Sequence, residues 1–138
     1  MSANASPTLV WFRQDLRLQD NPALQAALDG KRPVIPVYIW SPEEEGDWAP
    51  GGAQRWWIHR ALEHLKDELE KRDQQLVLRQ GGALEALLAL VEETGADRVV
   101  WNRRYEPPVT ARDTNVKSEL QDAGLEAADH VVKPARAP

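Results

Sequence analysis

Short apolar runs rich in β-branched and aromatic residues alternate along this chain with longer runs in which apolar residues recur every three or four positions. Runs of the first kind are typical of buried strands, and runs of the second kind are typical of amphipathic helices. Strands are predicted at 8–12, 34–40, 75–79, 98–102 and, with a weaker pattern, 125–132. Helices are predicted between them, at 23–28, 53–72, 83–94 and 107–123.

The apolar stripes of the three longer helices predict which face of each helix is buried. The first stripe consists of Ile58, Leu62, Leu65 and Leu69. The second consists of Leu84, Leu87, Leu88 and Val91. The last consists of Val109, Val116, Leu120 and Ala123. Each stripe is narrow enough to leave an opposite polar face, so these helices are expected to cover a sheet.

Proline, glycine and short polar residues mark the breaks between elements. Asn21 or Asp20 is a capping residue before Pro22, which suits a first helical turn. Pro36 lies inside the second strand and removes one ladder donor, which predicts a bulge there. The proline- and glycine-rich stretch 41–52 is predicted to be a loop.

The alternation of strands and helices predicts parallel pairing through right-handed crossovers. The expected fold is a single doubly wound, Rossmann-like α/β domain. Its five-stranded parallel sheet has the order 3-2-1-4-5, with helices on both faces. The domain is predicted to span residues 8–133. Residues 1–7 are expected to form a disordered tail, and 134–138 a C-terminal tail or the start of an interdomain linker.

Composition narrows the classes of function. The 138 residues carry a net charge of −5, with a sequence pI of about 5.2, which argues against direct DNA binding by this chain alone. No cysteine is present, so disulfides and thiolate metal sites are excluded. No apolar run approaches the roughly 20 residues of a membrane helix, and the polar N-terminus does not resemble a signal peptide. These features predict a cytoplasmic protein with no membrane partner.

Polar residues follow the predicted strands. In a doubly wound sheet, ligands bind outside the carboxyl ends of the strands, where the strand order reverses. With the order 3-2-1-4-5, Arg13 after the first strand and Asn102-Arg103 after the fourth would face each other across a crevice. The chain has no glycine-rich dinucleotide or P-loop motif, and His59 and His64 are five residues apart rather than four. From the residues alone, the prediction is therefore an α/β ligand-binding domain.

Four segments carry a more specific signal. They are WFRQDLRLQDNPAL (11–24), GGAQRWWIHRALEHL (51–65), QLVLRQG (75–81) and WNRRYEPPVTARD (101–113). Together, and in this order, they resemble segments of the DNA photolyase/cryptochrome family. The resemblance covers Leu9 to about Leu125 and is strongest to the cyclobutane pyrimidine dimer photolyases. It identifies the chain as similar to the N-terminal α/β domain of that family.

The resemblance implies that this domain binds an antenna chromophore: methenyltetrahydrofolate, 8-hydroxy-5-deazaflavin or FMN. It also implies that FAD and the DNA lesion are bound by a helical C-terminal domain, which nothing in this sequence resembles. The chain alone is therefore expected to be inactive as a lyase and to meet damaged DNA only within a full-length protein. Trp48, in a loop, is expected to belong to an exposed docking surface that favours self-association. The alternatives are a cryptochrome-like sensor domain and a stand-alone α/β signalling or nucleotide-binding module.

The resemblance also implies site residues, matched segment by segment. The candidates for chromophore binding are Arg13, Ser41, Arg55, Asn102, Arg103, Tyr105 and Glu106. In folate-type relatives the glutamate that matches Glu106 hydrogen-bonds the pterin, and the competing role for Glu106 is capping the helix that follows it. Asp15 and Arg17 are predicted to form an ion pair that holds their loop, and Arg112 and Asp113 are predicted to be structural.

Overall fold

The computed structural model of the chain describes residues 6–13, 15–48 and 50–131. The strands are β1 (Thr8–Phe12), β2 (Val34–Trp40), β3 (Val77–Gln80), β4 (Arg98–Asn102) and β5 (Glu126–His130). The helices are α1 (Pro22–Asp29), α2 (Gly52–Glu70), α3 (Ala83–Thr94), α4 (Pro107–Asp122) and the 3-10 helix η2 (Pro42–Trp48). The predicted tails at 1–7 and 134–138 lie largely outside the described residues and stay predictions.

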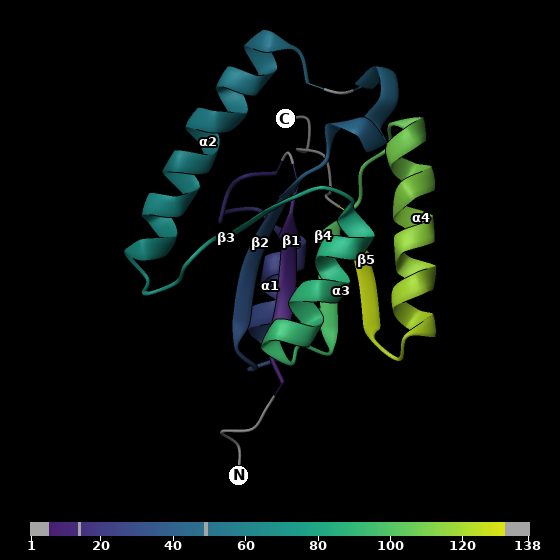
Figure 1. Cartoon of the computed structure of the whole chain (residues 1–138). Coiled ribbons are helices and arrows are strands. Elements are labelled where there is room, and N and C mark those ends of the chain that lie inside the picture. Colours follow the sequence, from purple (N-terminus) through teal and green to yellow (C-terminus); the bar gives the residue numbers. More distant parts are fainter. Residues whose placement is uncertain (1–5, 14, 49, 132–138) are drawn as a thin grey trace, which may run out of the picture.

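All five strands pair in parallel, in the order β3-β2-β1-β4-β5 (Figure 1). This arrangement confirms the predicted doubly wound sheet. Central strand β1 is buried along its whole length, as expected for a strand covered on both faces. The carboxyl ends of β1 and β4 lie side by side at the switch point, because the chain leaves β1 toward β2 on one side and returns to β4 on the other.

Two apolar cores lie on opposite faces of the sheet. Leu9 and Trp11 of β1 face a core completed by α3 and α4, and Val10 and Phe12 face a core completed by α1 and α2. This alternation along β1 follows from the two-residue repeat of a strand. The prediction of helices on both faces is therefore confirmed. No helix in the described part of the chain is long and apolar enough to cross a bilayer.

Two predicted helix faces need correction. On α3, Leu88 is 36% exposed, and Leu90 is buried instead, because Ala83, Leu87 and Leu90 fall on the face that meets the sheet. On α4, Ala123 lies beyond the last helical turn and is exposed. The buried stripe of α4 instead includes Asp113, a charged residue on a core face.

The bulge predicted at Pro36 is wrong. β1 and β2 pair in an unbroken register, with Pro36 opposite Val10. The Thr8 amide donates to the Pro33 carbonyl, so the backbone of Pro33 faces β1. Successive residues of a strand direct their backbone polar groups to opposite sides, so the Pro36 nitrogen faces β3 rather than β1. Pairing with β3 begins only at Val37, so the missing donor disrupts no ladder hydrogen bond. The predicted loop at 41–52 also differs, since η2 occupies most of it.

Candidate ligand site at the carboxyl edge of the sheet

Arg13 and Asn102 both lie at the switch point, but the space between them is closed. The Arg13 Nη2 atom donates to the Asn102 carbonyl oxygen at 2.6 Å. Both residues are buried, with 5% and 4% of their surface exposed. No open crevice separates them, because the Arg13 guanidinium contacts the Asn102 backbone directly. Their predicted contact with a ligand stays a prediction.

Asp113 explains how the Arg13 charge is held inside the protein. Its carboxylate lies 2.8 Å from Arg13 Nη1 and 3.1 Å from Arg112 Nη2. Burial lowers the pKa of Arg13, and the neighbouring Asp113 carboxylate opposes that shift. Arg13 Nε has no hydrogen-bond partner among the described residues. The pair joins the end of β1 to the core face of α4.

The Asn102 side chain fastens the segment after β1. Its Oδ1 atom accepts a hydrogen bond from the Ala23 amide at 2.9 Å. Its Nδ2 atom donates to Asn21 Oδ1 at 2.7 Å and also to the Asp15 carboxylate. Asn21 in turn caps α1, because its Oδ1 accepts from the Leu24 amide at 3.1 Å. Asn102 therefore links β4, α1 and the loop after β1 through its side-chain hydrogen bonds.

The predicted ion pair between Asp15 and Arg17 is wrong. The Arg17 guanidinium donates to the backbone carbonyls of Gln19 and Asp20, at 3.0 and 3.1 Å. The Asp15 carboxylate accepts from the Arg13 amide at 2.7 Å and from Asn102. Both side chains still hold the loop, as predicted, but each does so through its own contacts. The charged residues that follow β1 therefore stabilise the loop through hydrogen bonds and fill the switch point.

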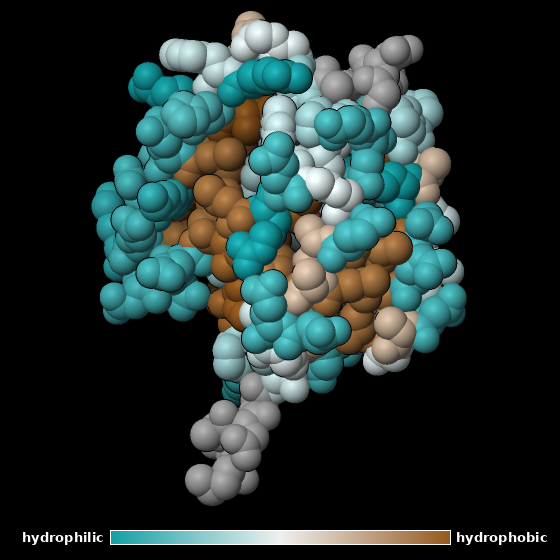
Figure 2. Space-filling model, viewed as in Figure 1, coloured by the Kyte–Doolittle hydropathy of each residue, from teal (hydrophilic) through white to brown (hydrophobic). Residues whose placement is uncertain are grey.

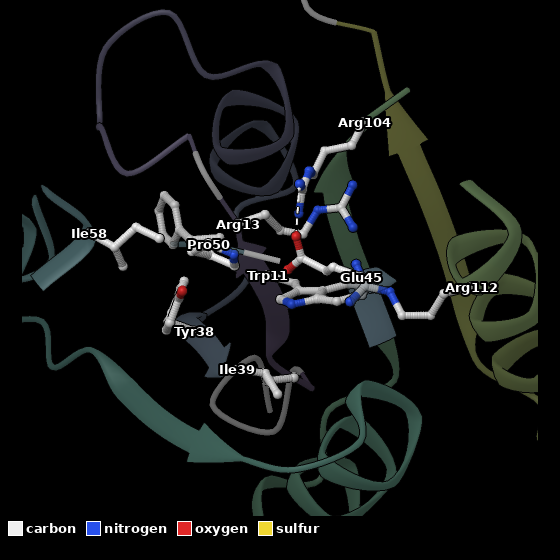
Figure 3. Close-up of a pocket in the computed structure, with 10 residues that line it drawn as sticks. Trp11, Arg13, Tyr38, Ile39, Glu45, Pro50, Ile58, Arg104 and Arg112 are labelled. Atoms are coloured by element: carbon white, nitrogen blue, oxygen red, sulfur yellow. Dashed lines mark hydrogen bonds and ion pairs between the residues drawn. The ribbon is translucent and has the colours of Figure 1, made fainter. Parts of the chain in front are cut away.

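A small crevice pocket lies beside this network (Figure 3). Trp11, Arg13, Tyr38 and Arg112 line it, and Glu45 of η2 closes one side by pairing with Arg104 at 3.1 Å. Figure 3 shows the Glu45 carboxylate turned toward the arginine side chains. The free volume is about 20 Å³, enough for one water molecule but not for an aromatic ligand. Burial, aided by the charge of Glu45, raises the pKa of Tyr38 to about 12.

The candidate site residues from the segment after β4 have separate surroundings and do not converge on one pocket. Glu106 is the N-cap residue of α4, but its side chain makes no capping hydrogen bond. It pairs with Arg104 at 2.9 Å instead. Burial is the largest single influence and disfavours the ionised form, but the hydrogen bond and charge of Arg104 together with backbone hydrogen bonds outweigh it and lower the pKa of Glu106. Arg103 turns toward β5 and pairs with Asp129 at 2.8 Å, and Tyr105 is 65% exposed.

A larger groove lies between α2 and the sheet. Figure 1 shows that α2 stands apart from the strands there. We call this groove the α2 groove. It has a volume of about 470 Å³ and runs between α2 and the carboxyl ends of β2 and β3. Its lining residues are Tyr38, Trp40, Arg55, Ile58, His59, Leu62, Leu78, Arg79 and Gln80. Figure 2 shows the apolar surface of this hollow, with hydrophilic side chains around it.

Of the predicted site residues, only Arg55 lines the α2 groove. Ser41 is buried elsewhere, with its hydroxyl 3.5 Å from Arg112 Nη1. The sequence reasoning missed Tyr38 and Trp40, although their two-residue spacing places both on one face of β2. It also missed the buried position of Asp113, which is four residues after Val109 and three before Val116. In the described residues, no cluster of His, Asp or Glu could hold a metal ion.

The fold and the groove define a doubly wound α/β domain with a ligand-sized hollow at the carboxyl edge of its sheet. The chain belongs to the DNA photolyase family, whose model matches residues 8–135. This finding agrees with the resemblance seen in the four sequence segments. The match covers every strand and helix of the described structure.

Individual relatives support the same assignment. The chain is 51% identical, over 125 residues, to a deoxyribodipyrimidine photo-lyase of Agrobacterium fabrum, and this match covers 91% of the chain and 26% of that relative. It is 45% identical to cryptochrome-1 of Sinapis alba over 126 residues, covering 91% of the chain and 25% of the cryptochrome. The chain thus spans about a quarter of the length of these curated relatives.

Solved structures share the fold. A bacterial class III photolyase from Agrobacterium tumefaciens superposes with a TM-score of 0.86 at 48% identity, covering 93% of this chain and 26% of that one. An archaeal photolyase from Sulfolobus tokodaii, solved with two FAD molecules, superposes with a TM-score of 0.80 at 27% identity, covering 91% of this chain and 29% of that one. These matches show that the chain corresponds to one domain of a photolyase or cryptochrome.

Proposed function

We propose that this chain is the antenna-binding N-terminal domain of a deoxyribodipyrimidine photolyase. Family membership and the 51% identity to a curated photolyase support the proposal. Light-driven DNA repair and lyase chemistry then belong to a full-length protein with a helical FAD-binding domain. The chain itself would bind the light-harvesting chromophore, either methenyltetrahydrofolate, 8-hydroxy-5-deazaflavin or FMN.

The observation that carries this proposal is the α2 groove. Its volume of about 470 Å³ falls within the range of small-molecule sites. Tyr38 and Trp40 offer aromatic surface to a planar ring system, and Leu62 and Leu78 extend the apolar lining. Leu78 is 53% exposed without a ligand, so a bound ring would remove apolar surface from water.

A cryptochrome-type light sensor is the second candidate. The 45% identity to a plant cryptochrome over 126 residues favours it, since that match covers the same domain. Both candidates place a chromophore in the domain, and they differ in whether the full-length protein repairs DNA. Repair of pyrimidine dimers by the full-length protein under near-ultraviolet or blue light would support the photolyase, and its absence would support the sensor.

A binding titration tests the proposed site. Each of the three chromophores is added to the purified chain and to two variants, Trp40→Ala in the groove and Trp56→Ala outside it. We expect one chromophore to bind, and Trp40→Ala to weaken its binding about fivefold or more, since an aromatic contact contributes roughly 1 kcal/mol beyond buried area. Trp56 is 64% exposed and does not line the groove, so Trp56→Ala should bind like the parent chain. Equal loss in both variants, or no binding of any chromophore, would contradict the proposal.

A further inference from the structure

The cationic side chains at the rim of the α2 groove differ in their partners. Arg79 Nη2 pairs with Glu93 at 3.0 Å, and His59 lies 3.7 Å from Glu63. Arg55 has no carboxylate within ion-pair distance among the described residues. In a chain whose net charge is −5, an arginine with no acidic partner in the described part of the structure is a local source of positive potential.

The position of Arg55 is set by two contacts. Its Nε atom donates to the Pro50 carbonyl at 3.1 Å. Its guanidinium carbon lies 5.4 Å from the centre of the Trp40 ring, within the range of a cation–π contact. Neither contact uses the two Nη groups, which make no hydrogen bond to any other described residue. These Nη groups can donate together to a phosphate or a carboxylate.

The crevice pocket beside the groove has the opposite character. Its three guanidiniums, those of Arg13, Arg104 and Arg112, are paired with the four carboxylates of Glu44, Glu45, Glu106 and Asp113. Carboxylates therefore outnumber cations by one, and an anionic group entering from the groove would be repelled. The anionic end of a ligand is favoured at the Arg55 rim instead.

We propose that the α2 groove selects planar aromatic ligands that carry an anionic group, with the ring against Trp40 and the anion on Arg55. This inference rests on the proposed function, because the same groove would hold the chromophore. It adds a chemical class: a phosphate- or carboxylate-bearing ring system is preferred over a neutral molecule with the same ring. Arg55 then determines specificity, and Trp40 supplies affinity common to both.

FMN and riboflavin provide the test, since they share one ring system and differ in a phosphate. Dissociation constants of both are measured by quenching of flavin fluorescence, with the 138-residue chain at low salt. We expect FMN to bind about fivefold more tightly, as is typical of an ion pair at a solvent-exposed rim. The ratio should fall to about one in Arg55→Gln and recover in Arg55→Lys. In the matched control Arg72→Gln the ratio should persist, because Arg72 pairs with Glu68 and does not line the groove.

The outcomes separate this inference from the proposed function. Equal affinity for FMN and riboflavin in the parent chain overturns the charge selection and leaves chromophore binding intact. A ratio that persists in Arg55→Gln overturns the assignment to Arg55. Failure of both flavins to bind overturns the inference, and the proposed function fails with it only if methenyltetrahydrofolate and the deazaflavin also do not bind.

Discussion

At the residue scale, a buried ion pair between Arg13 and Asp113 occupies the switch point of the sheet. Arg13 and Asp113 are a hundred positions apart, yet they form a buried ion pair at 2.8 Å whose side chains are 3% and 11% exposed. A buried pair adds little net stability, but removing one partner strands the other charge away from water. The pair therefore makes folding depend on a contact that the local pattern around either residue does not reveal.

Asp113→Asn should destabilise the fold by about 3 kcal/mol, since it leaves the buried Arg13 guanidinium without its main carboxylate. Urea unfolding followed by circular dichroism measures the change. Asp122→Asn is the control, because Asp122 is an exposed residue of the same helix and should change stability by less than about 0.5 kcal/mol. A loss below about 1 kcal/mol for Asp113→Asn would show that solvent reaches the Arg13 guanidinium and compensates its charge.

Glu45→Gln should lower the pKa of Tyr38 from its value of about 12, because it removes the negative charge that adds to the effect of burial. The pKa should stay above the ordinary value of about 10, since burial is the larger cause. Ultraviolet titration in a Tyr105→Phe background isolates Tyr38, as the chain has two tyrosines. An unchanged pKa would mean that Glu45 does not approach Tyr38 in solution.

Glu106→Gln should weaken folate binding by roughly 1–3 kcal/mol if the Glu106 carboxylate accepts hydrogen bonds from the pterin. The competing role seen in the structure is to hold Arg104, which lies 2.9 Å away. Calorimetric titration with methenyltetrahydrofolate measures the change, and Arg104→Gln is the matched comparison. Unchanged affinity in Glu106→Gln would leave Glu106 with the structural role alone.

At the scale of elements, the pattern of the sequence predicts most of the architecture. β1, β2 and β4 have the predicted bounds, and α1 is capped by Asn21 as expected, because hydrophobic period and capping chemistry act locally. The features that the sequence pattern did not predict depend on tertiary structure. Pro36 is tolerated because β3 begins pairing only one residue later. The α2 groove depends on how far α2 stands from the sheet, which the stripe on its own surface does not specify.

Edge strand β5 is fastened by one carboxylate. Asp129 accepts from Arg103 at 2.8 Å and from Lys117 of α4 at 3.0 Å. Burial opposes ionisation, but these two cations outweigh it and lower the pKa of Asp129 to about 2. Because the folded pKa lies below the unfolded value of about 4, this stabilisation is fully present above pH 4 and is lost as the pH falls toward 2.

Acid titration of stability tests this fastening. Asp129→Asn should lose about 2 kcal/mol at pH 7, as expected for a pKa depressed by nearly two units. The difference from the parent chain should shrink as the pH falls from 4 to 2, because the parent carboxylate then becomes neutral as well. Urea midpoints at pH 7, 4 and 2.5 give the comparison. A difference that is constant with pH would assign the loss to packing rather than charge.

At the scale of the whole molecule, we expect a domain that binds a light-absorbing ligand but does no chemistry. The acidic charge balance removes the electrostatic attraction that drives non-specific DNA binding. We expect the chain to retain no FAD after desalting and to repair no pyrimidine dimers in light. Retention of one FAD per chain together with light-dependent repair would contradict the expectation that FAD binding and repair need the helical domain.

The chain should also self-associate through its exposed aromatic surface. The side chain of Trp48 lies outside the described residues, but Trp56 and Trp57 of α2 are 64% and 53% exposed. Exposed apolar patches of this kind are typical of interaction surfaces. Sedimentation velocity should show concentration-dependent association that weakens in the double variant Trp56→Lys, Trp57→Lys. A parent chain that stays monomeric at all concentrations would refute the prediction.

A planar chromophore is expected to bind in the α2 groove, and the tryptophan indole N–H signals in a nitrogen–proton NMR spectrum report on that binding. Trp40 lines the groove, whereas Trp11 and Trp101 are buried in the core at 2% and 1% exposure. Titration with FMN or methenyltetrahydrofolate should move the Trp40 signal saturably, with much smaller shifts of Trp101. A saturable shift centred on Trp101 or Trp11 with Trp40 unmoved, or no saturable shift at all, would contradict chromophore binding in the α2 groove.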